Sequence, residues 1–168
     1  MHSRVLDWIG DHAIPAVGAA AQGRILDIGG RYINGSPRDL FPDAESYTVL
    51  DLHDTPDVDV VADATTWQPD GTYDVVVCTE VLEHVADWHL IVATCATALS
   101  PGGYLILTCA TDPRGPHGGF SEAGPEPGEH YENVHPGKLA IAVAAYGLES
   151  EDMKVDESGD LYCLARKP

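Results

Sequence analysis

The chain has 168 residues, the length of one ordinary domain with a sizeable buried core. Its 27 acidic and 9 basic side chains give a formal net charge of −18, which would repel a phosphate backbone, so we expect no nucleic-acid partner. No apolar run approaches the roughly 20 residues of a membrane span, and we see no secretion signal, so we expect no membrane partner and a cytoplasmic location. The four cysteines occur in apolar patterns without C-x-x-C spacing, as buried reduced thiols do.

The N-terminal part of the chain is predicted to be helical. Residues 1–21 form one or two short helical patterns, which Gly10 and Pro15 interrupt. We expect this segment to lie as a lid over the ligand side of the domain.

An apolar run that ends in paired glycines follows. Residues 24–28 predict a buried strand, and Gly29 and Gly30 allow the backbone to turn tightly and approach a ligand. Asp27 either accepts hydrogen bonds from its own turn or helps to shape a ligand pocket. With Gly35, these glycines do not complete the G-x-G-x-x-G pattern of dinucleotide-binding turns, so the turn alone is a weak indication of a nucleotide.

Further apolar runs predict more strands of the same sheet, at residues 47–51, 58–63, 73–78 and 103–108. Asp51 and Asp63 end two of these runs, at the sheet edge where open α/β sheets bind ligands. The Asp51 carboxylate can accept hydrogen bonds from both hydroxyls of a ribose, although a plain turn residue is the alternative.

Helices are predicted between some of these strands. Ser36 can cap a helix in which Pro37 takes the first position, and Asp87 can cap another that ends before Gly103. Residues 52–57 are too few for a helical crossover, so we expect the helix between the second and third strands to be reduced or lost.

The late part of the chain has two sections. Residues 110–135 are rich in Gly, Pro, Glu and His without periodicity, which is typical of a functional or mobile loop. Residues 136–168 predict a helix and then an antiparallel strand pair that turns near residues 157–160.

In this order and spacing, the motifs LDIGG, VLDL, VADAT, YDVVVCTEVLEHV and LSPGGYLILT resemble the class I S-adenosylmethionine-dependent methyltransferases, above all the small single-domain enzymes with E-V-L-E-H after the fourth strand. The resemblance covers residues 23–109, with weaker similarity through 128–135. Arg31 departs from the family pattern, because it stands where the next glycine would be.

The resemblance implies a doubly wound, Rossmann-like α/β fold with a mostly parallel sheet and an antiparallel last strand. We expect a single methyltransferase domain over residues 1–168, with a cofactor-binding half at 22–109, a substrate loop at 110–135, and the final helix and strand pair at 136–168.

The same resemblance implies roles for individual residues toward S-adenosylmethionine. Leu52 would cover one face of the adenine, and the Asp63 carboxylate and the Ala64 N–H would contact its edge; a solvated strand-ending acid is the alternative for Asp63. The backbone at 78–80 would form the floor beneath the methionine, with Cys78 more a core thiol than a nucleophile. The predicted cofactor contacts are Asp27, Gly29, Gly30, Gly35, Asp51, Leu52, Asp63, Ala64, Cys78, Thr79 and Glu80.

A metal site is the open question of the E-x-x-E-H motif. Some families with this motif hold a divalent cation with Glu80, Glu83 and His84, often together with a later histidine, and the two glutamates would share one helix face. The motif also occurs in relatives that need no metal, where the acids suit a helix N-terminus and the histidine packs at the edge of the site. We predict that no metal is bound.

Two histidines of the loop at residues 110–135, called the late loop below, are the predicted catalytic bases. His117 and His130 could each remove the proton of an acceptor at neutral pH. We rank His117 first because the flanking Gly and Pro residues at 115–119 would present it rigidly, whereas Tyr131 and His135 are weaker candidates.

These features predict an enzyme that transfers a methyl group from S-adenosylmethionine to a small molecule, with a hydroxyl as the first guess for the acceptor. The alternatives are a non-catalytic S-adenosylmethionine-binding regulatory module and a divalent-metal-dependent O-methyltransferase. A nicotinamide-dependent oxidoreductase would share the sheet, but its G-x-G-x-x-G turn and separate substrate region are not found in the sequence.

Overall fold

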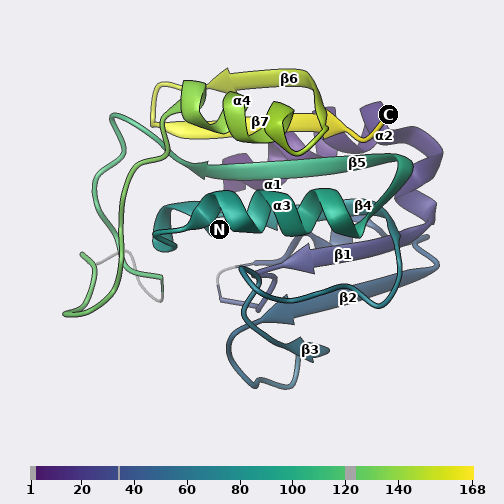
Figure 1. The fold of residues 1–168 in the computed structure, drawn as a ribbon, viewed down its shortest axis with the longest axis horizontal. Coiled ribbons are helices and arrows are strands. Elements are labelled where there is room, and N and C mark those ends of the chain that lie inside the picture. Colours follow the sequence, from purple (N-terminus) through teal and green to yellow (C-terminus); the bar gives the residue numbers. More distant parts are fainter. Residues whose placement is uncertain (1–2, 34, 120–123) are drawn as a thin grey trace.

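A seven-stranded sheet forms the centre of the part of the chain that the computed structural model describes, residues 3–33, 35–119 and 124–168 (Figure 1). The strand order is β3-β2-β1-β4-β5-β7-β6. All pairings from β3 to β5 are parallel, whereas β7 is antiparallel to both β5 and β6. The predicted fold class, a doubly wound α/β sheet with an antiparallel last strand, is confirmed.

The strands agree with the sequence in place and differ in length. Their bounds are Arg24–Ile28 for β1, Ser46–Asp51 for β2, Val60–Val61 for β3, Tyr73–Thr79 for β4, Leu99–Ala110 for β5, Glu149–Val155 for β6 and Asp160–Arg166 for β7. Strand β3 is shorter than predicted because the chain is still turning at Val58, whose N–H donates to the Thr55 carbonyl at 3.0 Å. Strand β5 begins earlier than predicted because Leu99 already pairs with Tyr73 of β4.

The longer helices lie where the apolar periodicity places them. They are α3, Trp88–Ala98, and α4, Pro136–Ala145, and Figure 1 shows both on one face of the sheet. Asp87 occupies the N-cap position of α3 without a side-chain capping bond, whereas His135 caps α4 by accepting a hydrogen bond from the Gly137 N–H at 3.0 Å. The α3/α4 face of the sheet carries the larger of two buried apolar clusters.

The N-terminal segment covers the opposite face. It comprises α1, Ser3–Trp8, a π-helical stretch Ile9–Ala13, α2, Ile14–Val17, and a 3-10 helix Gly18–Gln22. Its apolar side chains form a second core cluster with strand residues such as Val75 and Val77. What the structure shows is this cover of the sheet face, and the expected lid function remains a prediction.

The connections after β1 and β2 contain little helix. The helix predicted from Ser36 is a single 3-10 turn, Pro37–Leu40, with the Ser36 hydroxyl accepting from the Arg38 N–H at 3.1 Å. No helix occurs in the described residues between β2 and β3, as predicted from the length of that connection. The carboxyl ends of these strands are therefore covered by turns rather than by helices.

The segment between β5 and α4 has no helix or strand in its described residues, 111–119 and 124–135, as predicted. Backbone hydrogen bonds hold its end against the rest of the fold. The Glu132 N–H donates to the Glu83 carbonyl at 2.9 Å, and the Val134 N–H donates to the Ala110 carbonyl at 2.8 Å. The Asn133 side chain donates to the Arg114 carbonyl at 2.9 Å. These bonds place the segment beside the carboxyl ends of β4 and β5.

Two features of the whole chain agree with the composition. All four cysteines are buried and none forms a disulfide. Among the residues described, no helix combines the length and the apolar character that crossing a membrane requires.

One edge of the sheet is strand β6. All its side chains except that of Met153 are exposed. The pairing of β6 with β7 shifts register between Ser150 and Asp152, so that Glu151 is an extra residue in a bulge. The opposite edge is β3, which has two residues.

Candidate functional site

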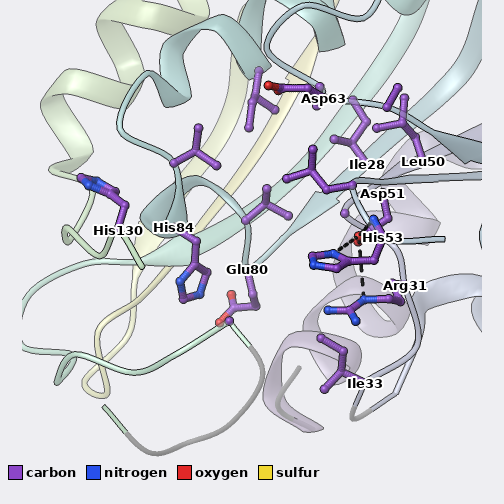
Figure 2. A pocket seen from close by; sticks show the side chains of 18 of the residues that line it. Ile28, Arg31, Ile33, Leu50, Asp51, His53, Asp63, Glu80, His84 and His130 are labelled. Atoms are coloured by element: carbon purple, nitrogen blue, oxygen red, sulfur yellow. Dashed lines mark hydrogen bonds and ion pairs between the residues drawn. The ribbon is translucent and has the colours of Figure 1, made fainter. Parts of the chain in front are cut away.

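A cavity of about 460 Å³ opens at the carboxyl ends of β1, β2 and β4 (Figure 2). Its size is within the range of small-molecule and cofactor sites. The apolar part of its wall includes Ile28, Leu50 and Ile91, and the late loop contributes Gly119, Gly128, Glu129 and His130. Residues from the first half of the chain and from the late loop thus share one pocket.

The glycine turn after β1 brings two strand ends together. Gly29 has φ +73°, in the left-handed region that favours glycine, and its N–H donates to the Leu50 carbonyl at 2.7 Å. A Cβ on Gly29 would lie 2.3 Å from the Val81 side chain, and one on Gly30 would lie 2.3 Å from the Asp27 carboxyl carbon. The turn therefore packs on the segment after β4 and on its own aspartate, at distances that exclude a side chain.

Asp27 supports this turn from below. Its carboxyl group is fully buried and accepts a hydrogen bond from the Tyr47 hydroxyl at 2.7 Å, whereas Oδ1 has no hydrogen-bond partner among the described residues. Burial raises the pKa of Asp27 to about 7, and the bond from Tyr47 opposes that rise. Asp27 does not line the cavity, and the side-chain hydrogen bond that it accepts comes from Tyr47 rather than from the N–H groups of its own turn.

Asp51 lies on the cavity wall at the end of β2, and its side chain has two neighbours there, His53 and Arg31. Its Oδ1 atom accepts from the His53 N–H at 2.9 Å, is 2.9 Å from His53 Nδ1, and lies 3.8 Å from Arg31 Nε (Figure 2). His53 and Arg31 line the cavity themselves. The sequence indicated Asp51 as a binding residue and did not single out His53.

The far end of the cavity is formed by residues around β3. Asp63 and Ala64 both line it, and Asp63 Oδ1 also accepts from the Thr65 N–H at 2.8 Å and the Thr65 hydroxyl at 2.7 Å. Asp63 therefore has the structural role of stabilising its turn in addition to its place on the wall. Leu52 lies on the wall with 61% of its surface exposed, so its side chain is open to contact with a ligand in the cavity.

Glu80 lines the cavity at the end of β4 with a backbone of positive φ, +57°, in a non-glycine residue. Such backbone strain is concentrated at functional sites. Glu80 Oε1 accepts from the Thr108 hydroxyl at 2.9 Å, and Oε2 lies 3.9 Å from Arg114 Nη2. Burial raises the pKa of Glu80, and the hydrogen bond from Thr108 opposes the rise.

Beyond Glu80, the turn after β4 meets the late loop in a compact cluster of Glu83, His84, His117 and Tyr131. Ligand atoms of Glu83, His84 and His117 all lie within 4.8 Å of one another. The rings of His84 and His117 are 5.1 Å apart and nearly perpendicular, and Tyr131 contacts both rings. Glu80 and Glu83 do not share a helix face as expected, because the 3-10 helix spans Leu82–His84 and Glu80 precedes it in a left-handed conformation.

The cluster keeps its histidines neutral. Burial lowers the pKa of His84 to about 4, with a further contribution from His117, and burial also lowers the pKa of His117. Burial, together with the nearby charge of Glu80, raises the pKa of Glu83, whose Oε1 accepts from the Ala110 N–H at 3.1 Å. His117 Nδ1 lies 3.3 Å from the Gly115 carbonyl oxygen, which can only accept. A hydrogen bond to this carbonyl uses the tautomer with the proton on Nδ1, in which the lone pair of the neutral ring is on Nε2, 3.9 Å from Glu83 Oε1.

The two predicted catalytic histidines occupy different places. His130 lines the cavity, and its buried Nε2 has no hydrogen-bond partner among the described residues. His117 does not line the cavity and contacts the ring of His84, which does. His130 and His84 thus lie on the cavity wall and His117 lies behind His84, while the ranking of His117 above His130 as a base stays a prediction.

The site residues predicted from the sequence fall into two groups, those that line the cavity and those that do not. The residues that line the cavity are Gly29, Asp51, Leu52, Asp63, Ala64, Glu80 and His130. The residues that do not line it are Asp27, Gly30, Gly35, Cys78, Thr79 and His117; Cys78 and Thr79 are buried strand residues below the wall.

Sequence reasoning missed several wall residues, among them Arg31, Ile33, His53 and Val85. The sequence did hold a signal for two of them. Arg31 departs from the glycine pattern of the family, and His53 lies two residues after Asp51, which was predicted to bind the ligand.

Comparison with known proteins gives one family and one fold. A family model described as a methyltransferase domain matches residues 11–151. The ubiquinone biosynthesis O-methyltransferase of Burkholderia multivorans (strain ATCC 17616 / 249) is 34% identical over 113 residues, which cover 61% of this chain and 49% of that protein. This chain spans about half the length of such curated relatives.

Two solved structures show how widely the fold is shared. The S-adenosylmethionine-bound amino pentose methyltransferase CalS10 from Micromonospora echinaspora has a TM-score of 0.68 and 20% identity, over 99% of this chain and 91% of that one. The [4+2]-cyclase SpnF has a TM-score of 0.70 and 17% identity, over 98% of this chain and 81% of that one. Such likeness establishes the fold alone, since proteins named for different reactions share it.

Proposed function

Because the chain belongs to the methyltransferase domain family, among the class I S-adenosylmethionine-dependent methyltransferases, we propose that it transfers a methyl group from S-adenosylmethionine to a hydroxyl of a small molecule. The observation that carries the proposal is the cavity at the carboxyl ends of β1, β2 and β4, with Asp51 on its wall. A likeness of fold would not be enough, because the fold also occurs in SpnF.

The wall of this cavity fits the cofactor in its polar and apolar parts. Asp51 Oδ1 and Oδ2 can accept hydrogen bonds from ribose hydroxyls, in the place where such sheets bind ribose. Leu50, Leu52 and Ile91 offer apolar surface for a purine, and Asp63 and the Ala64 N–H offer an acceptor and a donor for its edge. Glu80 offers a carboxylate to the ammonium group of the methionine.

The chain's own part in the reaction is alignment and proton removal. The bound sulfonium supplies an activated methyl group, so a protein that orients the acceptor in line and excludes water provides much of the rate. We assign His130 as the base that removes the hydroxyl proton, because of the two predicted histidines it is the one that lines the cavity, and its Nε2 has no hydrogen-bond partner among the described residues. His117 is the second candidate, acting next to His84.

The choice of an oxygen acceptor rests on the curated relatives. The Burkholderia multivorans protein is named an O-methyltransferase, but this chain spans only about half of it, so the acceptor of that protein is not assigned to this chain. A formal charge of −18 disfavours an anionic acceptor as well as nucleic acid.

The four buried cysteines without disulfides support a reducing, cytoplasmic location.

The proposed function is tested by calorimetry followed by turnover. We expect S-adenosylmethionine and S-adenosylhomocysteine to bind with dissociation constants in the micromolar range, and NAD to show no binding. A panel of small hydroxyl compounds with labelled S-adenosylmethionine should then yield labelled product. Binding of neither adenosyl ligand would overturn the proposal, and binding without turnover on any acceptor class would favour the regulatory-module alternative.

A divalent-metal-dependent O-methyltransferase is the second candidate, and one observation favours it. Glu83, His84 and His117 offer a carboxylate oxygen and two imidazole nitrogens within 4.8 Å of one another, and mixed oxygen and nitrogen ligands suit Mn²⁺ or Zn²⁺. The His117 tautomer, with Nδ1 held by a backbone carbonyl, is one that metal-binding histidines adopt. The set proposed here differs from the Glu80, Glu83 and His84 set that the motif left open, because it contains His117 in place of Glu80.

Chelation separates the two candidates. We expect turnover to survive dialysis against EDTA, because the histidines can remove a proton without a metal. Loss of turnover with EDTA, rescue by Mn²⁺, Mg²⁺ or Zn²⁺, and no rescue of Glu83→Gln would establish the metal-dependent enzyme instead. Glu132→Gln is the matched control, since Glu132 is exposed in the same loop region and lies outside the cluster.

A further inference from the structure

Arg31 is a charged residue of the pocket to which the function proposed above gives no role. It follows the glycine turn directly and lines the cavity, and its side chain is 15% exposed. Figure 2 shows this side chain between those of His53 and Ile33, on the same side of the pocket as Asp51. Its Nε lies 3.8 Å from Asp51 Oδ1, which is ion-pair distance and longer than a hydrogen bond. The guanidinium therefore lies beside the proposed ribose site, at ion-pair distance from Asp51.

The cavity wall is rich in acidic residues, so the positive charge of this guanidinium matters for binding an anionic group. Among the described residues that line the cavity, Arg31 is the only arginine or lysine, whereas Asp51, Asp63, Glu80 and Glu129 are acids. The whole chain also carries a formal charge of −18. A ligand that brings its own carboxylate into this cavity is repelled unless a cation lies close to that group.

The order of residues along the pocket tells which end of the ligand meets Arg31. Asp63 and Ala64 lie at the end of the cavity near β3, and Asp51 lies at the end of β2. A ligand with its purine at Asp63 and its ribose at Asp51 extends its amino-acid portion toward the ends of β1 and β4. Gly29, Arg31 and Glu80 line the cavity there, and the amino-acid portion carries both an ammonium and a carboxylate group.

We propose that Arg31 binds the α-carboxylate of the amino-acid portion of S-adenosylmethionine, an inference that rests on the function proposed above. The planar guanidinium donates two parallel N–H bonds to the carboxylate and in doing so moves away from Asp51. Asp51 is then left to the ribose. The arginine at a position where the family has glycine is thus a binding residue of this chain, and Glu80 is left to face the ammonium group.

The test compares ligands that differ in the group that Arg31 is proposed to bind. Calorimetry measures S-adenosylhomocysteine, which has the carboxylate, decarboxylated S-adenosylmethionine, which lacks it and keeps the ammonium, and 5′-methylthioadenosine, which lacks the whole amino acid. The variants are Arg31→Gln and Arg31→Lys. Arg38→Gln is the matched control, because Arg38 is exposed on the same connection and does not line the cavity.

Arg31→Gln should weaken S-adenosylhomocysteine by about 10-fold to 100-fold, as expected for a charged hydrogen bond, and change the other two ligands by less than about 2-fold. Arg31→Lys should recover part of the loss, and Arg38→Gln should bind all three ligands like the wild type.

Equal weakening of all three ligands by Arg31→Gln, with an unchanged melting temperature, would overturn the inference, because Arg31 would then act through Asp51 and the turn. Unchanged binding of S-adenosylhomocysteine to Arg31→Gln would also overturn it. Both outcomes leave the proposed function in place, whereas a wild-type protein that binds none of the three ligands removes the function and the inference together.

Discussion

The cofactor half, residues 22–109, and the late loop, residues 110–135, line one cavity but are built in different ways. In the first, parallel strands in fixed register carry the wall residues: Ile28 pairs with Leu50, and Asp51 pairs with Val61. In the second, single hydrogen bonds such as that from Glu132 to the Glu83 carbonyl determine where the chain runs. A periodic scaffold therefore positions the proposed cofactor site, whereas individual contacts position the proposed acceptor site, and the two should respond differently to mutation.

The largest effect should come from the late loop. His130→Ala should lower turnover on a hydroxyl acceptor by about 100-fold or more while S-adenosylhomocysteine affinity changes little, because a general base acts on the acceptor and not on the cofactor. His117→Ala should cause a smaller loss, since His117 does not line the cavity. Steady-state kinetics and calorimetry measure the two quantities, with His89→Ala on the exposed side of α3 as the control. A larger loss in His117→Ala than in His130→Ala would return the base to His117.

A smaller effect, of the opposite kind, is expected from the cofactor half. Asp51→Ala should weaken S-adenosylhomocysteine by about 1.5 to 3 kcal/mol, because charged hydrogen bonds to the ribose are lost. Asp54→Ala removes the same charge from an exposed position three residues away and should bind normally. If both variants bind like the wild type and circular dichroism shows intact folds, Asp51 is not part of the site.

The smallest effect concerns the support under the glycine turn. Burial raises the pKa of Asp27 from 3.8 to about 7, so between these pH values the folded chain keeps a proton that the unfolded chain has released. The contribution of this group to the free energy of unfolding therefore falls as the pH rises from about 4 to 7 and is constant above that.

Asp27→Asn keeps an oxygen that can accept the Tyr47 hydroxyl bond and removes the titration. We expect the melting temperature of Asp27→Asn, relative to the wild type, to rise by about 3 °C or more between pH 5 and pH 8. Asp43→Asn, at an exposed position, should show no such trend. A constant difference across this pH range would mean that Asp27 is already ionised in the folded protein at pH 5.

The cofactor half and the late loop also differ in how much of their structure could be predicted from the sequence. Strand positions and their terminal acids could be predicted, because apolar period and chain direction place the ends of parallel strands on one edge of the sheet. The helix expected after Ser36 was wrong in extent, since its cap formed but the chain continued for only one 3-10 turn. Local capping signals predict where a helix begins and say little about its length.

The residues that could not be predicted are those placed by tertiary contacts. Nothing in the neighbourhood of His117 or Tyr131 indicates that their rings would contact His84, because the residues are distant in sequence and the loop has no periodicity. His53 was not singled out, although its contact with Asp51 spans only two residues of sequence. Where an acidic residue at the end of a strand is predicted to bind a ligand, the residues that follow it in the turn should therefore be considered as binding residues as well.

The acidic edge strand β6 has a consequence for how this protein behaves at high concentration. Glu149, Glu151 and Asp152 are exposed along this edge, and the bulge at Glu151 interrupts the row of backbone groups that another strand would need. Two copies that approached by this edge would meet like charges and mismatched hydrogen bonds. The opposite edge, β3, offers two residues for pairing. The sheet is thus protected at both sides from growing into larger β-aggregates, and on the β6 side that protection should weaken as acid or salt neutralises the carboxylates.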